Sequence, residues 1–347
     1  MEPENISIAH NKIIITSIKT ELKNIKTFYF EYADNKQIKY KSGQFITLLS
    51  SDENNRRSYS LSTLPTDDFA GFTVKRIDNG LFSRRLIDQT CVGDQFKIIE
   101  PSGFFTIPDD INNYKTVYFF AAGIGITPIF SIIRYLLDTT TLNLNLIYSN
   151  KSIDQTLFYH ELNDLLDKHP GRFIIQYLFS NAADLSRARL NKQAVHQALS
   201  GFSEKERRES LFFVCGPFSY MRMVIFGLEE QNIPLENIKK ENFTVLPTHN
   251  YAQPKDIDTH VVQIKIGDSV YTFDTVFPDT ILQSARKHGI QLPYSCETGQ
   301  CGSCAAVCTS GQVWMSQNEV LTDRELQNGY ILTCTGYAVG GDITIRL

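Results

Sequence analysis

The last part of the chain contains cysteines with a spacing that few folds can use. Three follow a C-x4-C-x2-C pattern and a fourth comes further along the chain: Cys296, Cys301, Cys304 and Cys334. This is the ligand spacing of a plant-type [2Fe–2S] cluster, in which two tetrahedral irons need four thiolates and one tight loop supplies three of them. The alternatives are a structural zinc site or scattered core cysteines. Structural zinc usually shows paired C-x2-C knuckles or Cys/His mixtures, and a single C-x2-C is present. The pattern therefore predicts one-electron chemistry.

The composition is that of an ordinary globular protein with ample core. The chain has 347 residues, which favours about two or three domains. Its hydrophobic share is 42% and its charged share is 21%. A net charge of −4 provides no basic field, so no nucleic-acid partner is expected. The cysteines at 91, 215 and 308 leave an odd remainder, which fits a reducing, cytoplasmic location better than a disulfide framework.

An uncharged run between residues 116 and 133 is long enough to resemble a membrane span. Gly123, Gly125 and Pro128 interrupt it, and its first part is β-branched and aromatic. A buried strand, a glycine turn and a helix explain the run better, so no membrane insertion is predicted. The N-terminus is acidic and lacks the apolar core of a signal peptide.

The pattern of apolar runs changes along the chain and predicts three domains and a linker. Residues 1–110 contain short apolar runs divided by turn residues, which indicates an antiparallel β-barrel or sandwich with little helix. Residues 111–246 alternate strand-like and helical stretches, which indicates an α/β domain with a parallel sheet. Residues 247–259 are polar with two prolines, as in a linker, and residues 260–347 combine a hairpin, a helix, the cysteine loop and closing strands.

Four short motifs follow one another in the first domain. They are Arg57-Ser58-Tyr59-Ser60, Val74-Lys75-Arg76, Asn79-Gly80-Leu81-Phe82-Ser83 and Pro101-Ser102-Gly103-Phe104-Phe105. Together they resemble the flavin-binding domain of the ferredoxin–NADP reductase family, which implies a flavin-binding barrel that holds FAD, with FMN as the alternative. The family usually has Gly where Asn79 stands, but Asn also tolerates positive φ.

The resemblance implies roles for these residues. Arg57 would offer a planar fork to a flavin phosphate, Tyr59 would lie against the isoalloxazine ring, and Ser60 would form a hydrogen bond near its reactive N5. Backbone N–H groups from Gly80 to Ser83 would face a pyrophosphate. The other expected cofactor-binding residues are Ser58, Val74, Lys75, Arg76, Leu81 and Phe82.

A glycine turn opens the predicted helix of the second domain: Gly123-Ile124-Gly125-Ile126-Thr127-Pro128. Glycines let a backbone approach a pyrophosphate, and proline suits a first helical turn. The turn is similar to the G-x-G-x-T-P of the same family, in which a second turn, here Cys215-Gly216-Pro217, lies beside the nicotinamide. The resemblance makes Cys215 and Ser60 the expected catalytic residues; for Cys215 the alternative is a small buried hydrophobe.

The residues after the predicted strand 173–179 bear on the choice of nucleotide. Ser180 ends this strand, and Arg187 and Arg189 follow it. In NADPH-using relatives a Ser and an Arg near this point hold the 2′-phosphate, so NADPH is favoured. Asp184 lies in the same loop and keeps NADH open.

The sequence also suggests roles for two further residues, Phe243 and Glu297. Phe243 would cover the flavin face opposite Tyr59 until nicotinamide displaces it, or would be a core residue at a strand end. Glu297, beside the first cluster cysteine, should disfavour adding an electron to the cluster.

The order of the domains resembles the reductase components of multicomponent oxygenases. The stretch from Gly311 to Cys334 is similar to the subfamily of phenylacetyl-CoA epoxidase systems, which implies a β-grasp-type, α+β ferredoxin domain. The implied function is an NAD(P)H-dependent reductase in which flavin accepts a hydride and the cluster passes single electrons to an oxygenase, with a non-haem di-iron partner favoured. Alternative acceptors are a desaturase, a ring-hydroxylating dioxygenase or a cytochrome P450. A non-catalytic redox sensor or adaptor is the other class.

Overall fold

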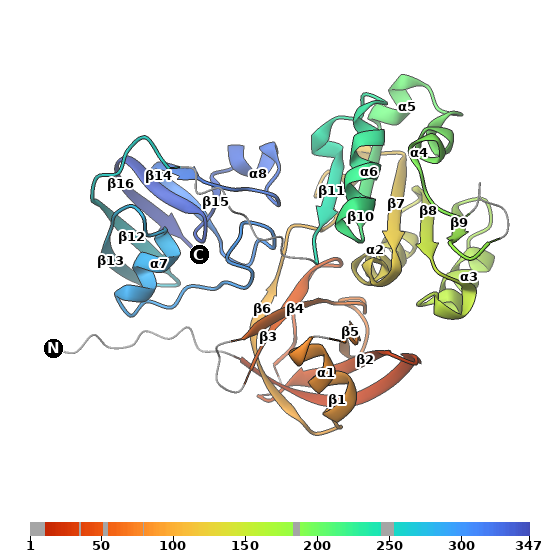
Figure 1. The fold of residues 1–347 in the computed structure, drawn as a ribbon, viewed down its shortest axis with the longest axis horizontal. Helices are drawn as coiled ribbons and strands as arrows, with labels where there is room; N and C mark the ends of the chain where they lie inside the picture. The colour runs from red at the N-terminus through yellow and green to blue at the C-terminus, as the bar shows by residue number, and fades with distance from the viewer. Residues whose placement is uncertain (1–10, 35, 51–54, 79, 183–187, 244–252) are drawn as a thin grey trace. The chain divides into compact units, whose positions relative to one another are not determined.

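The computed structural model describes residues 11–34, 36–50, 55–78, 80–182, 188–243 and 253–347. They form two compact units, one ending at residue 243 and the other beginning at residue 253. The first unit contains a six-stranded and a five-stranded sheet, and the second contains a five-stranded sheet (Figure 1).

The six-stranded sheet is an antiparallel barrel with strand order β4-β3-β6-β1-β2-β5. A bridge between Leu61, which follows β4, and Phe72 of β5 brings the two edge strands together. Phe28, Phe30 and Phe72 fill its core and are fully buried. The predicted antiparallel barrel is confirmed. Its elements are β1 (Asn11–Leu22), β2 (Ile25–Tyr32), β3 (Phe45–Leu49), β4 (Arg56–Ser60), β5 (Ala70–Lys75), α1 (Leu81–Gln89) and β6 (Gln95–Ser102).

The second sheet is parallel, with strand order β11-β10-β7-β8-β9. Its central strands are apolar on both faces, as in sheets covered on both sides. Phe119 and Phe213 pack with α2 and α3, whereas Phe120 and Phe212 pack with α4 and α6. The predicted α/β fold is confirmed. Its elements are η1 (Ile111–Asn113), β7 (Thr116–Ala122), η2 (Gly123–Gly125), α2 (Ile126–Thr139), β8 (Asn143–Asn150), η3 (Ile153–Gln155), α3 (Tyr159–Lys168), β9 (Phe173–Phe179), α4 (Lys192–Leu199), α5 (Glu204–Arg208), β10 (Ser210–Cys215), α6 (Phe218–Glu229), η5 (Leu235–Asn237) and β11 (Ile238–Glu241).

The second unit is a mixed sheet with strand order β13-β12-β16-β14-β15, in which β12 and β16 are parallel. Val262, Ile264 and Ile345 form part of its core. The helix α7 begins after Thr280, whose side chain forms a reciprocal capping box with Gln283. The predicted α+β fold is confirmed. Its elements are β12 (His260–Ile266), β13 (Ser269–Thr275), α7 (Ile281–Lys287), β14 (Ala305–Met315), α8 (Asp323–Gln327), β15 (Tyr330–Leu332) and β16 (Gly336–Arg346).

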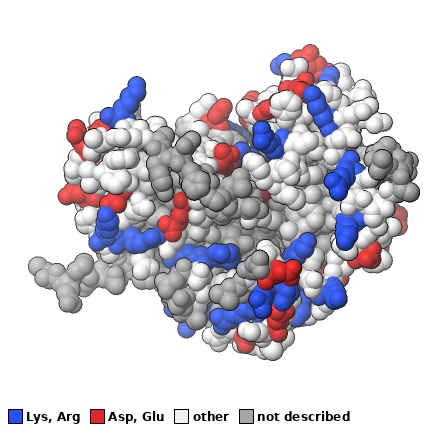
Figure 2. Space-filling model, in the orientation of Figure 1, with Lys and Arg blue, Asp and Glu red and all other residues white. Residues whose placement is uncertain are grey.

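Part of the predicted linker is tied to the second unit. Residues 247–252 lie outside the described residues, but Asp256 accepts a hydrogen bond from the main-chain N–H of Gly340 in β16. Lysine and arginine are interspersed with aspartate and glutamate over the face shown in Figure 2. Across the described ranges, every helix is too short or too polar to cross a membrane.

Candidate cofactor sites

Strand β4 presents an aromatic ring and a cation at one edge of the barrel. The ring of Tyr59 stacks on Phe72, with ring centroids 5.7 Å apart. Burial raises the pKa of the Tyr59 hydroxyl, which keeps the ring neutral. Ser58 Oγ shares a hydrogen bond of 2.8 Å with Thr47 Oγ1, and the exposed Arg57 donates to a neighbouring main-chain carbonyl at 2.6 Å. These side chains offer a flat apolar face and an anion-binding group on one strand.

The two predicted catalytic residues are brought together by a third residue. Ser60 is buried and its hydroxyl donates a hydrogen bond of 3.0 Å to Glu241 Oε2. Glu241 ends β11 and is the register partner of Cys215, which ends β10. Glu241 belongs to none of the motifs in the sequence; its only sequence signal is its position two residues before Phe243.

The environment of this group perturbs both ionisable side chains. Burial raises the pKa of Glu241 to about 8, and the hydrogen bond from Ser60 opposes part of that rise. The Cys215 thiol is fully buried, and burial together with the charge of Glu241 raises its pKa. The group therefore holds a neutral thiol beside a carboxyl that titrates near neutral pH.

Two of the three side chains in the second barrel motif, Val74-Lys75-Arg76, are already engaged by other parts of the protein. The side chain of Val74 lies in the barrel core, and Lys75 is exposed. Arg76 Nε lies 3.1 Å from Asp88 Oδ2, and its Nη1 lies 3.1 Å from Asp78 Oδ1. Val74 can therefore meet a cofactor only through its main chain, and Arg76 already has two carboxylate partners.

The third barrel motif forms the start of α1. Gly80 is its N-cap, and no side chain caps the helix. Ser83 Oγ accepts from the Ile77 N–H at 3.1 Å, and a Cβ atom at Gly80 would lie 2.7 Å from this oxygen. Phe82 lies 6.5 Å from Tyr59 between ring centroids. Asn79 and the Leu81 side chain lie outside the described residues. The glycine and the uncapped first turn fit a phosphate group.

The glycine turn of the parallel sheet lies against the turn after β10. Gly123 has φ +55°, and a Cβ atom at Gly125 would lie 2.4 Å from the Cys215 carbonyl oxygen. Thr127 Oγ1 donates to a carbonyl of the turn at 3.1 Å, and Pro128 lies in the first turn of α2. The backbone of one predicted motif therefore contacts the backbone of the other, at the carboxyl ends of adjacent parallel strands.

The residues after Cys215 complete this edge. A Cβ atom at Gly216 would lie 3.0 Å from the Ala122 side chain, and Pro217 is the N-cap of α6. The Tyr220 hydroxyl donates to the Ala121 carbonyl at 3.2 Å, which fixes α6 against β7. The turn is thus closely packed on the strand that leads into the glycine turn.

The predicted nucleotide-discriminating residues are only partly described. Ser180 is exposed directly after β9, where its N–H donates to the Asn150 carbonyl at 3.0 Å. Arg189 is exposed, and Arg187 lies outside the described residues. Phe243 follows β11 with 42% of its surface exposed, which argues against the core alternative.

The cluster cysteines lie in the second unit as two close pairs. The sulfurs of Cys304 and Cys334 lie 3.2 Å apart, and the thiols of Cys296 and Cys301 share a hydrogen bond. The main-chain N–H groups of residues 298 and 303 point at Cys296 and Cys301 sulfurs, each at 3.5 Å. A Cβ atom at Gly299 would lie 2.7 Å from a carbonyl oxygen, so the loop needs glycine here. Four thiols, of which Cys296 and Cys301 accept main-chain N–H bonds, are the donor set that a [2Fe–2S] cluster needs.

The acidic residue in this loop has a partner. Glu297 has φ +57°, a conformation that non-glycine residues seldom adopt. Its Oε1 lies 3.3 Å from Arg286 Nη2 of α7, and the same guanidinium lies 4.4 Å from the centroid of the Tyr294 ring. Arg286 therefore offsets the negative charge that Glu297 brings to the cluster loop.

Two family models match the chain at the sheets described above. Residues 119–225 match an oxidoreductase NAD-binding domain, and residues 264–339 match a 2Fe-2S iron-sulfur cluster binding domain. The second match includes all four cluster cysteines. The predicted cluster and nicotinamide nucleotide are confirmed at this level.

Several relatives align with most of this chain. The ferredoxin reductase component of 3-ketosteroid-9-alpha-monooxygenase from Mycolicibacterium smegmatis is 31% identical over 320 residues, which cover 89% of this chain and 87% of the relative. One of the subunits of the 1,2-phenylacetyl-CoA epoxidase of Escherichia coli is 27% identical, over 96% of this chain and 97% of its own. The phthalate dioxygenase reductase structure matches with a TM-score of 0.61 at 23% identity over 97% of both chains, which confirms the fold. The chain therefore belongs to the ferredoxin reductase components of oxygenase systems and is an NAD(P)H-dependent flavin and iron–sulfur oxidoreductase.

Proposed function

We propose that this reductase takes hydride from NADPH at the group formed by Ser60, Glu241 and Cys215, and that its partner is an oxygenase of the non-haem di-iron type. The 3.0 Å hydrogen bond between Ser60 and Glu241 carries the first part, because it joins the barrel strand β4 to the parallel sheet beside Cys215. The likeness to the phenylacetyl-CoA epoxidase subunit over nearly the whole chain supports the second part.

FAD, when bound, accepts two electrons as a hydride and releases them singly. The chain would hold it with the ring face of Tyr59, the guanidinium of Arg57 and the N–H groups that begin after Gly80. Ser60 Oγ would hydrogen-bond a ring nitrogen while Glu241 holds a proton on its carboxyl, since burial keeps that carboxyl largely protonated below its pKa of about 8.

The nucleotide would lie along the carboxyl edge of the parallel sheet. The turn would leave room for a pyrophosphate at Gly123, where nothing lies within 4 Å of a Cβ position, and the buried, neutral thiol of Cys215 would lie beside the nicotinamide. Ser180 and Arg189, both exposed after β9, would meet the 2′-phosphate of NADPH. The ratio of kcat/KM for NADPH to kcat/KM for NADH tests this preference. A ratio above one supports it, and a ratio below one contradicts it.

The thiols of the second unit would carry the cluster. Cys304 and Cys334 are buried and Cys296 and Cys301 are half-buried, so the cluster would have one protected side and one side open to an electron acceptor. The N–H groups that point at the sulfurs would stabilise the negative charge of the reduced state.

Substitution of Ser60 tests the hydride-transfer group. Ser60→Ala removes the hydroxyl but no core volume, and we expect anaerobic flavin reduction by NADPH to slow by about 100-fold with the flavin still bound. Ser17→Ala makes the same change at an exposed position of β1 and should leave the rate unchanged. Equal rates for the two variants would remove Ser60 from the site.

Reconstitution tests the partner. The purified reductase would replace the similar subunit in the Escherichia coli phenylacetyl-CoA epoxidase, and product formation would be measured with NADPH. The oxygenase component of a 3-ketosteroid-9-alpha-monooxygenase is the comparison acceptor, because a reductase of that system shares 31% identity with this chain. Faster coupled turnover with the ketosteroid system would favour that partner instead.

A further inference from the structure

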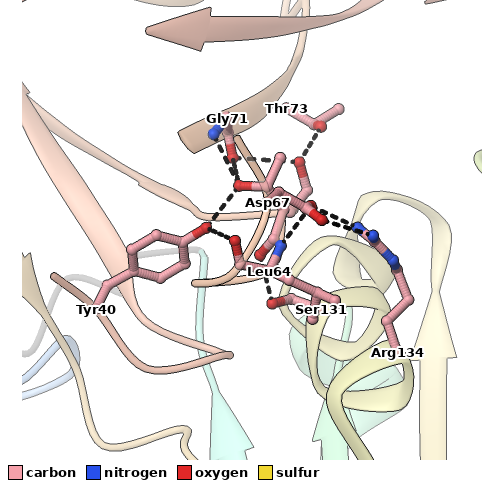
Figure 3. A network of polar contacts seen from close by, with 9 residues as sticks. Tyr40, Leu64, Asp67, Gly71, Thr73, Ser131 and Arg134 are labelled. Carbon is pink, nitrogen blue, oxygen red and sulfur yellow. Dashed lines mark hydrogen bonds and ion pairs between the residues drawn. The ribbon is translucent and has the colours of Figure 1, made fainter. Parts of the chain in front are cut away.

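A polar network formed by residues outside the cofactor motifs joins the barrel to the parallel sheet (Figure 3). The carboxylate of Asp67 and the guanidinium of Arg134 form two parallel contacts of 2.9 Å each. Three residues earlier on the same helix, Ser131 is fully buried and donates to the Thr63 carbonyl at 2.7 Å. Asp67 and Thr63 belong to the loop between β4 and β5, whereas Ser131 and Arg134 belong to α2.

The loop that carries Asp67 is itself held in place. Asp67 Oδ2 accepts a hydrogen bond from the Leu64 N–H at 2.8 Å, and the Tyr40 hydroxyl donates to the Leu64 carbonyl at 2.6 Å. The Thr63 hydroxyl accepts from the Gly71 N–H at 2.8 Å, which ties the loop to β5. Figure 3 shows these side chains converging on the loop from both sides. A shift of α2 would therefore move the loop with it.

Both ends of this network continue directly into cofactor motifs. The loop begins after Ser60, the last residue of β4, and it ends at β5. Helix α2 begins immediately after the turn from Gly123 to Gly125. Because an α-helix is a stiff element, the position of Arg134 fixes the position of the turn that opens the helix.

The packing around the network leaves little room for sliding. Gly43 of the barrel approaches α2 so closely that a Cβ atom there would lie 2.9 Å from Ile132 Cδ1. Phe105 packs edge-on against Phe213 of the parallel sheet, with centroids 5.1 Å apart. Apolar contacts of this kind hold two bodies together but are not directional. The bidentate ion pair supplies the direction that apolar packing lacks.

The exposure of the ion pair argues for orientation over stability. Each of the two side chains is 28% exposed, and ion pairs in contact with water contribute little to the free energy of unfolding. Hydride transfer, in contrast, needs its donor and acceptor atoms held within a narrow range of distance and angle, so small misplacement has a large effect on rate.

We propose that Asp67 and Arg134, supported by Ser131, are positioning residues that set the barrel and the parallel sheet in register for hydride transfer. This inference rests on the proposed transfer of hydride at Ser60, Glu241 and Cys215. Within the described part of the chain, the hydrogen bonds of the Asp67, Ser131 and Arg134 side chains go to one another or to residues 63 and 64, outside the predicted cofactor motifs.

The test uses the full-length protein with flavin and cluster bound. Asp67→Asn and Arg134→Lys each remove the bidentate geometry while keeping size or charge, and Glu230→Gln, which breaks an ion pair with Lys192 inside the parallel-sheet domain, is the control. Anaerobic stopped-flow reduction over a range of NADPH concentrations separates the limiting rate from the nucleotide Kd. Flavin content and the thermal midpoint are measured for every variant.

We expect Asp67→Asn and Arg134→Lys each to lose about tenfold in limiting rate with Kd changed less than about twofold, and the double variant to be no slower than either single one. Limiting rates equal to that of Glu230→Gln would overturn the inference, as would a loss confined to Kd. If one of the two variants loses its flavin, the limiting rate of the other variant tests the inference. A wild-type protein that neither NADPH nor NADH reduces would instead contradict the proposed function.

Discussion

The hydroxyl of Ser60 donates a hydrogen bond of 3.0 Å to the carboxylate of Glu241, although 181 residues separate the two in the chain. One residue ends a barrel strand and the other ends the outer strand of the parallel sheet. Burial raises the pKa of Glu241 to about 8, so the pair gains or loses one proton close to neutral pH. The contact thus places a titratable carboxyl beside the Ser60 hydroxyl.

Glu241→Gln should remove a titration from the activity profile. In the wild type, kcat/KM for NADPH should change across a pKa near 8, and in the variant this step should be absent while the remaining rate is lower. The measurement is steady-state ferricyanide reduction as a function of pH, with Glu236→Gln, an exposed carboxyl a few residues earlier, as the control. A variant profile that keeps the step would assign the titration to another group.

The same substitution should change the pH dependence of stability. The folded protein binds a proton at Glu241 up to pH about 8, whereas the unfolded chain releases it near the ordinary glutamate pKa of 4.5. The unfolded state therefore holds fewer protons in this window, and the free energy of unfolding falls as pH rises through it. Urea unfolding at the two ends of the window should show a smaller fall for Glu241→Gln than for the wild type.

Gly125→Ala should weaken both the fold and nucleotide binding. The added methyl group would lie 2.4 Å from the Cys215 carbonyl oxygen, a main-chain atom that cannot move aside on its own. We expect a loss of about 1–3 kcal/mol in the free energy of unfolding, and weaker NADPH binding because Cys215 is displaced. Gly201→Ala, where nothing lies within 4 Å of the new atom, is the control. Equal stability of the two variants would show that the turn relaxes freely.

Sequence could predict the parts of the site that lie within one segment. The cluster cysteines are found by their spacing, because three of the ligands share a single loop. The glycine turn is found in the same way, because Gly125, the residue that must lack a side chain, is itself part of the motif. Glu241 escapes such reasoning, because its partner Ser60 is distant in sequence and an isolated glutamate at a strand end has no pattern.

The motifs also do not predict which side chains pair with one another in the folded protein. Arg76 belongs to a motif of the flavin-binding family, yet Asp78 and Asp88 surround its guanidinium. Asp67 and Arg134 belong to no motif, and only the packing of α2 on the barrel brings them together. Competition between nearby carboxylates and a ligand depends on rotamers, which the order of residues does not encode.

Cys301→Ser should separate the two halves of electron transfer. The variant should lose the visible absorption of the cluster, while NADPH should still bleach the flavin at about the wild-type rate, because Ser60 and Cys215 belong to the other unit. Cys308→Ser removes a half-buried thiol outside the ligand set and should retain the cluster spectrum. Loss of flavin reduction in Cys301→Ser would show that the units are not functionally separable.

Arg286→Gln should lower the reduction potential of the cluster. Its guanidinium offsets Glu297, and without it the negative charge in the loop opposes the incoming electron. A redox titration followed by electron paramagnetic resonance should show a fall on the order of tens of millivolts, since both side chains are partly exposed. Lys287→Gln removes a charge from the same helix that pairs with Asp279, so an equal shift there would point to long-range charge and not to Glu297.

The bridge between Leu61 and Phe72 has a consequence for the protein before it acquires its flavin. An open strand edge is a template on which another molecule can add a strand, and this is a common route to aggregation. The strand that presents Tyr59 and Ser60 would be such an edge if the barrel stayed flat. Because the two edge strands meet, the edge of β4 is largely unavailable for pairing with strands of neighbouring molecules, even before the flavin binds.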